Sequence, residues 1–355
     1  MKHVLLYRRS LDVRSGAGQL IRMQADGLRS AGESVQLACQ RGGLRFFLRT
    51  GWPVRRISRT GTQALNDLST HLVIDHEMQL PGADLVFVHS LVSEGSLYQE
   101  REDWSPGIAR EAAFFKALTP TTPIVANSQL VKAAIMKHFE VDARRILVHY
   151  PGFQSAKFEA SKAATLRHKA RHALKLDDRT PLVGFVTSGD FQTRGLDTFL
   201  ESAERIVQAR PDVNFLVVGS KRLPDWAFSH PLVADGRVHY RPKSGRPELW
   251  LAALDIFLYA ARFDAFGMVA SEAQALGIPV LTSRRVGASE CLPPEYAPWL
   301  LREPDCNEFA AKAVMLLGDE RTRRALITAA REHVSAFSQE HYVAATVATI
   351  LDQKR

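Results

Sequence analysis

YAARFDAFGMVASEAQALGIPVLTS, the stretch from Tyr259 to Ser283, contains a complete strand–helix–strand pattern. The apolar run IFLYA ends at Ala260, a loop follows, and the spacing of apolar residues predicts a helix over 268–276. Gly277 and Pro279 end this helix, because glycine suits the left-handed position after a helix and proline cannot continue it. The run PVLTS then predicts a second strand. This order indicates a βαβ unit of a parallel sheet.

The start of this predicted helix is suited to an anion. Gly267 lies at the helix start, so the backbone N–H groups of Gly267, Met268 and Val269 have no partner within the helix, and the helix dipole adds to their attraction. Glu272 lies about one and a half turns further on. There its carboxylate can accept hydrogen bonds from two hydroxyl groups of a ribose beside the phosphates. Asp264, in the preceding loop, is expected where a sugar would lie. The alternative is an ordinary βαβ unit whose Glu272 faces solvent.

The same alternation extends along the whole chain. Short apolar runs predict strands at 3–7, 34–39, 83–89, 123–126 and 146–150, and again at 182–186, 214–219, 238–240, 256–260 and 279–283. Helical patterns separate most of them, including one over 62–71. Fully apolar strands alternating with helices are typical of a doubly wound parallel sheet. We therefore expect an α/β protein with one Rossmann-like domain over 1–155, a second over 156–335, and a terminal helix over 336–355 that crosses back to the first.

Composition excludes several classes of protein. The 355 residues suffice for roughly two domains, and 46% hydrophobic with 24% charged residues is ordinary for a globular protein, which excludes disordered and fibrous chains. No apolar run approaches the roughly 18 residues of a transmembrane helix, and the apolar stretch Val4–Tyr7 is too short for a secretory signal. The three cysteines have no short spacing, so we expect no metal site, no disulfide framework and a cytoplasmic location.

Positive charge is concentrated near the N-terminus. Residues 1–60 contain twelve Lys and Arg against three Asp and Glu, a net charge of +9, whereas the whole chain is +8. The densest part, Arg41–Gly61, is here called the basic segment; it has six arginines, no acid, and the aromatic residues Phe46, Phe47 and Trp52. Arginine beside aromatic residues suits an anionic membrane surface or nucleic acid, and a solvated basic face is the plain alternative. We favour the membrane and expect no nucleic acid.

The 259–283 stretch resembles a known family. Asp264 and Glu272 are eight residues apart, the spacing of the E-x(7)-E motif of retaining glycosyltransferases of family four. The flanking Phe266-Gly267 and Gly277–Val280 are similar to that family's usual sequence. Asp190-Phe191, Arg194–Asp197 and the Pro-Val-Leu-Thr ending resemble the lipopolysaccharide core glucosyltransferases in particular. The resemblance is strong over about residues 180–290 and weakest before residue 80.

This resemblance implies the GT-B fold, in which two Rossmann-like domains face across a cleft and the second holds most of a nucleotide-sugar donor, with a UDP-sugar favoured. It also implies retention of anomeric configuration and independence from metal. Arg194 is then expected to meet the donor diphosphate, because a guanidinium can bind phosphate in a bidentate way. Many relatives carry a second basic residue where this chain has Gly189, and usually Glu where it has Asp264. Lys221 and Arg222 could supply that charge or could be a solvated pair.

The first domain offers three further candidates for the donor site. Gly16 and Gly18 follow the first predicted strand, where the family's glycine-rich loop lies, and glycine allows close approach of the backbone to phosphates or sugar. A simple turn is the alternative. His89 closes the strand at 83–89, and relatives often have a histidine near this position that contacts the donor sugar.

These features predict a cytoplasmic, peripherally membrane-associated hexosyltransferase. Its acceptor would be a growing glycan, either lipopolysaccharide core or another lipid-linked saccharide, and it would need no cofactor beyond the nucleotide sugar. Two rivals stay open. A nucleotide-sugar epimerase would need acid–base residues that we do not find. A non-catalytic relative that binds membrane or sugar nucleotide is favoured by the departures at Asp264 and Gly189.

Overall fold

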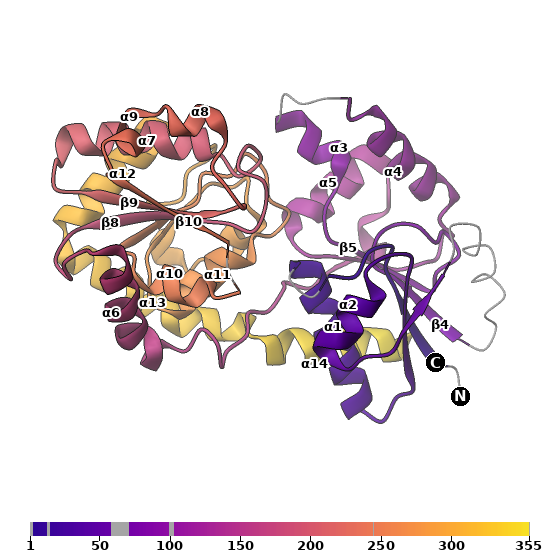
Figure 1. The fold of residues 1–355 in the computed structure, drawn as a ribbon. Coiled ribbons are helices and arrows are strands. Elements are labelled where there is room, and N and C mark those ends of the chain that lie inside the picture. Colours follow the sequence, from indigo (N-terminus) through magenta and orange to yellow (C-terminus); the bar gives the residue numbers. More distant parts are fainter. Residues whose placement is uncertain (1–2, 13–14, 58–70, 99–102, 244, 355) are drawn as a thin grey trace. The chain divides into compact units, whose positions relative to one another are not determined.

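The computed structural model describes residues 3–12, 15–57, 71–98, 103–243 and 245–354. The chain divides into two compact units (Figure 1). The first unit comprises the residues up to Gly152 together with those from Gln339 onward, and the second unit is Phe153–Ser338.

The first unit is built on a parallel sheet with strand order β3-β2-β1-β4-β5-β6-β7 in its described part. The strands are β1 (His3–Tyr7), β2 (Val35–Cys39), β3 (Val54–Arg56), β4 (His71–Asp75), β5 (Leu85–Val88), β6 (Ile124–Ala126) and β7 (Ile146–Val148). The helices are α1 (Gly16–Ser30), α2 (Gly43–Thr50), α3 (Val92–Gly95), α4 (Ser105–Ala117), α5 (Gln129–Phe139) and α14 (Gln339–Asp352).

Close packing attaches α14 to this unit, against α1 (Figure 1). Gly27 of α1 permits the contact, because a Cβ atom there would lie 2.3 Å from a methyl group of Val343. A buried hydrogen bond of 2.8 Å from Gln24 to the hydroxyl of Tyr342 lies in the same contact. Ile350 reaches the hydrophobic core formed by β1, β2 and β4. The last helix of the chain therefore belongs to the core of the first unit.

The second unit has a parallel sheet with strand order β10-β9-β8-β11-β12 in its described part. Its strands are β8 (Leu182–Val186), β9 (Asn214–Gly219), β10 (Val238–Pro242), β11 (Ile256–Leu258) and β12 (Val280–Leu281). Its helices are α6 (Ala163–Leu174), α7 (Leu196–Ala209), α8 (Asp225–Phe228), α9 (Pro231–Ala234), α10 (Pro247–Ala252), α11 (Met268–Ala275), α12 (Cys306–Gly318) and α13 (Glu320–Val334).

A buried arginine fixes the start of this second sheet. Arg171 of α6 is fully buried and contacts the Asp255 carboxylate at 2.8 Å. The same carboxylate accepts a hydrogen bond of 2.8 Å from the backbone N–H of Leu182, the first residue of β8. The other guanidinium nitrogens donate to backbone carbonyl groups, including that of Ala253. Because each partner is satisfied, the buried charges cost little and set the positions of β8 and β11.

The expected parallel α/β sheets are confirmed, and strands lie in all ten predicted stretches. Among the elements that were not predicted from the sequence are α2, β3 and β4. β3 is a three-residue edge strand with two exposed arginines, so it lacks an apolar run. The predicted helix over 62–71 falls largely outside the described residues, and its last residue, His71, begins β4. Among the described helices, none is both long and apolar enough to span a membrane.

The α1–α14 contact predicts the effect of enlarging Gly27. Gly27→Leu should lower the free energy of unfolding by about 1–3 kcal/mol, because the side chain would push against Val343. Denaturant titration followed by circular dichroism measures the change. Gly318→Ala is the control, since no atom lies within 4 Å of a Cβ at that position. Equal losses in the two variants, or none in Gly27→Leu, would contradict this packing.

Candidate functional site

Two loops of the second unit meet because their strands are neighbours. β8 and β11 pair in parallel, so the loop after each strand leaves from the same edge of the sheet. The first loop, 187–195, leads into α7, and the second, 259–267, leads into α11. Arg194 and Asp264 lie on these two loops.

The two predicted side chains are in contact. One terminal nitrogen of Arg194, Nη2, lies 3.3 Å from Oδ2 of Asp264. The other, Nη1, donates to the backbone carbonyl of Phe263 at 2.6 Å. The hydroxyl of Tyr259 also donates to Oδ2 of Asp264, at 2.7 Å. Arg194 is therefore fixed between the two loops, and its charge is paired with one carboxylate.

Gly189 packs directly against this arginine. A Cβ atom at Gly189 would lie 2.9 Å from Nε of Arg194, so a larger residue would displace the guanidinium. The backbone N–H of Gly189 donates to the Thr187 hydroxyl at 3.0 Å. Lys221 and Arg222 are both exposed, and Arg222 lies 3.8 Å from Asp225. The structure thus brings one cation, Arg194, to Asp264.

The helix start predicted from the sequence is present. Gly267 precedes α11 with φ of +84°, a left-handed conformation that glycine adopts without strain. A Cβ atom there would lie 2.9 Å from Val286 and 3.3 Å from Oδ2 of Asp264. Within the described residues, no hydrogen bond from the backbone N–H groups of Met268 and Val269 is found. These two groups are therefore available to an anion beside Asp264.

Glu272 lies in the second turn of α11 and is half-buried. Burial raises the pKa of Glu272 to about 7; Lys157 opposes this shift and Glu248 adds to it. Lys157 also contacts Glu248 at 3.3 Å. Lys157 and Glu248 were not predicted from the sequence, because neither stands in a recognisable motif. In the described part of the chain the Glu272 carboxylate has no hydrogen-bond partner, so it can accept hydrogen bonds from the hydroxyl groups of a ligand.

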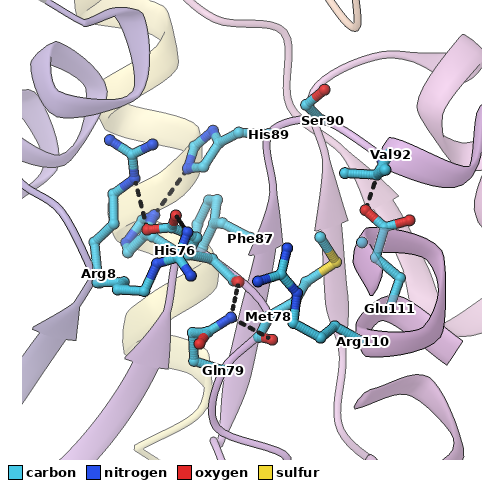
Figure 2. Close-up of a pocket in the computed structure, with 13 residues that line it drawn as sticks. Arg8, His76, Met78, Gln79, Phe87, His89, Ser90, Val92, Arg110 and Glu111 are labelled. Atoms are coloured by element: carbon cyan, nitrogen blue, oxygen red, sulfur yellow. Dashed lines mark hydrogen bonds and ion pairs between the residues drawn. The ribbon is translucent and has the colours of Figure 1, made fainter. Parts of the chain in front are cut away.

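The first unit has a separate pocket of about 220 Å³ (Figure 2). Its wall includes the predicted His89 together with Arg8, His76, Phe87 and Arg110. These residues come from the ends of β1, β4 and β5 and from α4. Polar groups around an aromatic ring suit a hydroxylated ligand.

Two stacked histidines form one wall of this pocket (Figure 2). Nδ1 of His76 lies 3.1 Å from Nε2 of His89, so one ring donates to the other. Burial, together with Arg8, lowers the pKa of His89 to about 3, and burial lowers that of His76 as well. Both rings are neutral at neutral pH. His76 was not predicted from the sequence, because it follows β4, a strand that was not predicted either.

The predicted glycines of the first unit, Gly16 and Gly18, form the start of α1. α1 begins at Gly16, and the N–H of Gly18 donates to the side chain of the capping residue Ser15 at 3.1 Å. A Cβ atom at Gly18 would lie 2.0 Å from the carbonyl oxygen of Asp12. The close approach at Gly18 is thus to the chain's own backbone.

The basic segment differs from expectation at two aromatic residues. Phe46 and Trp52 were expected as candidates for a membrane interface, but they are only 1% and 2% exposed. Trp52 donates to Asp26 at 2.7 Å and lies beneath the guanidinium of Arg29. Phe47 is 45% exposed. Sequence alone did not separate the inner from the outer aromatic residues, because both lie between arginines.

No group of three or more His, Cys, Asp or Glu side chains in the described residues is arranged to hold a metal ion. The three cysteines are free thiols. What the second unit offers is one fixed guanidinium, a helix start with available N–H groups, and one half-buried carboxylate. This set fits a ligand with phosphate and hydroxyl groups.

Comparison with known proteins is consistent with that set. Residues 167–333 match the family model described as "Glycosyl transferases group 1". A GDP-mannose-dependent monoacylated alpha-(1-6)-phosphatidylinositol monomannoside mannosyltransferase of Corynebacterium glutamicum is 31% identical over 179 residues, which cover 47% of this chain and 45% of that protein. The chain spans about half the length of the curated relatives it matches.

Two solved structures share the fold over nearly their full length. WaaG, a glycosyltransferase involved in lipopolysaccharide biosynthesis, has a TM-score of 0.77 at 18% identity, covering 98% of this chain and 99% of that one. Anabaena Alr3699/HepE in complex with UDP and glucose has a TM-score of 0.78 at 16% identity, covering 99% and 100%. This likeness confirms the predicted GT-B fold.

The raised pKa of Glu272 predicts how stability depends on pH. The pKa of Glu272 is about 7 in the folded state, above the ordinary value of 4.5, so the folded protein binds the carboxyl proton more tightly than the unfolded chain does. The contribution of Glu272 to stability therefore falls as pH rises from about 4.5 through 7. Glu272→Gln removes this contribution. The Tm of the variant minus that of the wild type should therefore be larger at pH 8 than at pH 5. An equal difference at both pH values would contradict the buried carboxyl.

Proposed function

From the match of residues 167–333 to the family model of the glycosyl transferases group 1, we propose that the protein is a retaining, metal-independent hexosyltransferase. It moves a hexose from a nucleotide-diphosphate sugar to a glycan acceptor. The observation that carries the proposal is the fixed guanidinium of Arg194 beside Asp264, which lies next to the free start of α11.

The donor diphosphate would bind at Arg194 and at the N–H groups of Gly267, Met268 and Val269. Negative charge grows on the diphosphate as the glycosidic bond breaks, so a cation held in place stabilises the transition state more than the ground state. The bond from Arg194 to the Phe263 carbonyl supports this role, because it holds the guanidinium without neutralising it. The same groups would make a divalent cation unnecessary.

Two carboxylates would bind the hydroxyl groups of the donor. Glu272 would accept hydrogen bonds from the ribose hydroxyls. Its carboxylate has no hydrogen-bond partner within the described residues, which supports this role. Asp264 would face the transferred sugar. For the donor base, UDP is favoured: HepE was solved with UDP and glucose, whereas the corynebacterial relative is GDP-mannose-dependent. Both nucleotides therefore belong in the first assay.

The acceptor would bind in the pocket of the first unit, so His89, expected from the sequence at the donor sugar, would here serve the acceptor. The neutral His89 can bind a hydroxyl group there without introducing charge, and Phe87 offers an apolar face. A lipid-linked saccharide, such as lipopolysaccharide core, is the acceptor class we favour. The names of two similar proteins, one acting on a phosphatidylinositol mannoside and one involved in lipopolysaccharide biosynthesis, support it.

The transfer proposal is tested with UDP-, GDP-, ADP- and TDP-sugars, by measuring release of free nucleotide with and without a glycan acceptor. At least one donor should be turned over, and EDTA should not abolish turnover. Arg194→Ala should lower the rate about 10- to 150-fold, since losing a hydrogen bond to a charged group costs about 1.5–3 kcal/mol.

Arg210→Ala is the matched control, because Arg210 pairs with Asp212 on the surface of the same unit. It should keep the wild-type rate. No nucleotide release from any donor would favour the non-catalytic alternative, and release of an isomerised sugar nucleotide would favour an epimerase. Near-normal turnover by Arg194→Ala would exclude the proposed diphosphate site.

We also propose that α2 holds the protein against anionic lipid. Leu44, Phe47 and Leu48 follow the i, i+3, i+4 spacing of one helix face, and they are 73%, 45% and 72% exposed. Arg45 and Arg49 on the same helix are exposed, as are Arg55 and Arg56 of β3. An exposed apolar face among arginines is suited to the interface of an anionic bilayer.

Vesicle sedimentation tests this surface. The wild type should sediment with anionic vesicles and less with neutral ones, and salt should weaken binding because the Debye length falls from about 10 Å at 0.1 M to about 3 Å at 1 M. Changing Arg45, Arg49, Arg55 and Arg56 to Gln should reduce binding, since each arginine near an anionic lipid surface contributes about 1 kcal/mol to the binding free energy.

The control changes four exposed arginines of the second unit to Gln: Arg179, Arg222, Arg302 and Arg324. It removes the same charge from another surface and should bind as the wild type does. Equal binding to neutral and anionic vesicles, or equal losses in both variants, would contradict a role for α2.

A further inference from the structure

Tyr259 is a buried tyrosine whose hydroxyl reaches into the Arg194–Asp264 contact. Its side chain is 1% exposed, and its ring packs near Phe257 and Phe185, with ring centres 5.5 and 6.4 Å away. A phenylalanine would satisfy these apolar neighbours equally well. The hydroxyl must therefore be explained by its polar partners, because a buried hydroxyl is costly unless it is hydrogen-bonded.

This hydroxyl has two polar neighbours. It donates to Oδ2 of Asp264 at 2.7 Å, and the Thr187 side chain lies on its other side, where it opposes the rise in the pKa of the phenol. Burial raises the pKa of Tyr259 well above its ordinary value, so the hydroxyl keeps its proton and remains a donor. Thr187 follows β8 and Tyr259 follows β11. The phenol thus connects the two loops that carry Arg194 and Asp264.

The contacts distinguish the two oxygens of the Asp264 carboxylate. Oδ2 accepts from Tyr259 and lies 3.3 Å from Arg194. Among the described residues, the only hydrogen bond to Oδ1 is a long one, 3.4 Å, from the N–H of Phe266. Gly267 fixes the surroundings, because a Cβ there would lie 3.2 Å from the Tyr259 ring and 3.3 Å from Oδ2. Oδ1 is the oxygen left for a ligand.

We propose that Tyr259 is a positioning residue of the donor site, which holds Oδ2 of Asp264 so that Oδ1 faces the transferred sugar and Arg194 keeps a nitrogen for the diphosphate. This inference rests on the proposed glycosyltransferase function. Without the phenol, the carboxylate would be free to turn and to bind Arg194 through both oxygens. That pairing would withdraw the guanidinium from the diphosphate, where it acts most strongly in the transition state.

The test is Tyr259→Phe, which keeps the ring and removes the hydroxyl. Its kcat for the donor that the wild type turns over should fall about 10- to 100-fold, with a smaller change in the donor KM. Tyr240→Phe is the matched control: the Tyr240 hydroxyl donates to the Ser220 carbonyl at 3.2 Å, so its removal should leave kcat unchanged. Circular dichroism and Tm establish that each variant is folded.

A double-mutant cycle with Asp264→Asn separates positioning from a merely structural role. If Tyr259 acts through the Asp264 carboxylate, Tyr259→Phe should cost less than about threefold in kcat when Asp264 is already Asn. The same loss in both backgrounds would overturn the proposal, and so would a wild-type kcat for Tyr259→Phe. Inactivity of the wild type with every donor would instead overturn the proposed function.

Thr187→Val provides a second route if Tyr259→Phe does not fold. It removes the hydroxyl beside the phenol, which also accepts from the N–H of Gly189 at 3.0 Å, and it should lower kcat about 2- to 10-fold in the Asp264 background only. An unchanged kcat, or an equal loss in the Asp264→Asn background, would overturn the proposal.

Discussion

The contact between Arg194 and Asp264 is the constraint on which the rest of the second unit's site depends. It joins the loops after two neighbouring parallel strands, β8 and β11, at a distance of 3.3 Å. Tyr259 lies against the same carboxylate, and Gly267 must be a glycine because that carboxylate and Val286 leave no room for a Cβ atom. One ion pair therefore sets the orientation of the cation and the entry into α11.

The charge balance of this site bears on the proposed diphosphate ligand. Arg194 and Asp264 neutralise one another, so neither is an unpaired buried charge, which would be costly. Under the proposed function, an arriving diphosphate would compete with Asp264 for the guanidinium and would gain the N–H groups of Met268 and Val269. The half-buried Glu272, with its pKa of about 7, adds a carboxylate that ionises readily when hydroxyl groups approach it.

The sequence predicted most of the second unit because its local signals agree with its fold. The strands at 182–186 and 214–219 are fully apolar, and Gly277 and Pro279 mark the end of α11 as expected. It predicted less of the first unit, where β3 is short and β4 follows residues that gave a helical pattern. Burial of Phe46 and Trp52 could not be predicted, because it depends on contacts with α1 and β2 rather than on neighbours in sequence.

The sequence singled out individual residues of the candidate site but not their network. Asp264 and Glu272 were expected from motif spacing and Arg194 from the family resemblance, whereas Tyr259, Lys157 and Glu248 contribute through contacts that spacing does not encode. Hydrogen–deuterium exchange across residues 264–275 and 187–195 tests the central claim most directly. With a nucleotide sugar that the protein turns over, exchange should slow at the first turn of α11 and in the Arg194 loop. Unchanged exchange there, with slowing confined to other segments, would contradict a donor site built on Arg194 and Asp264.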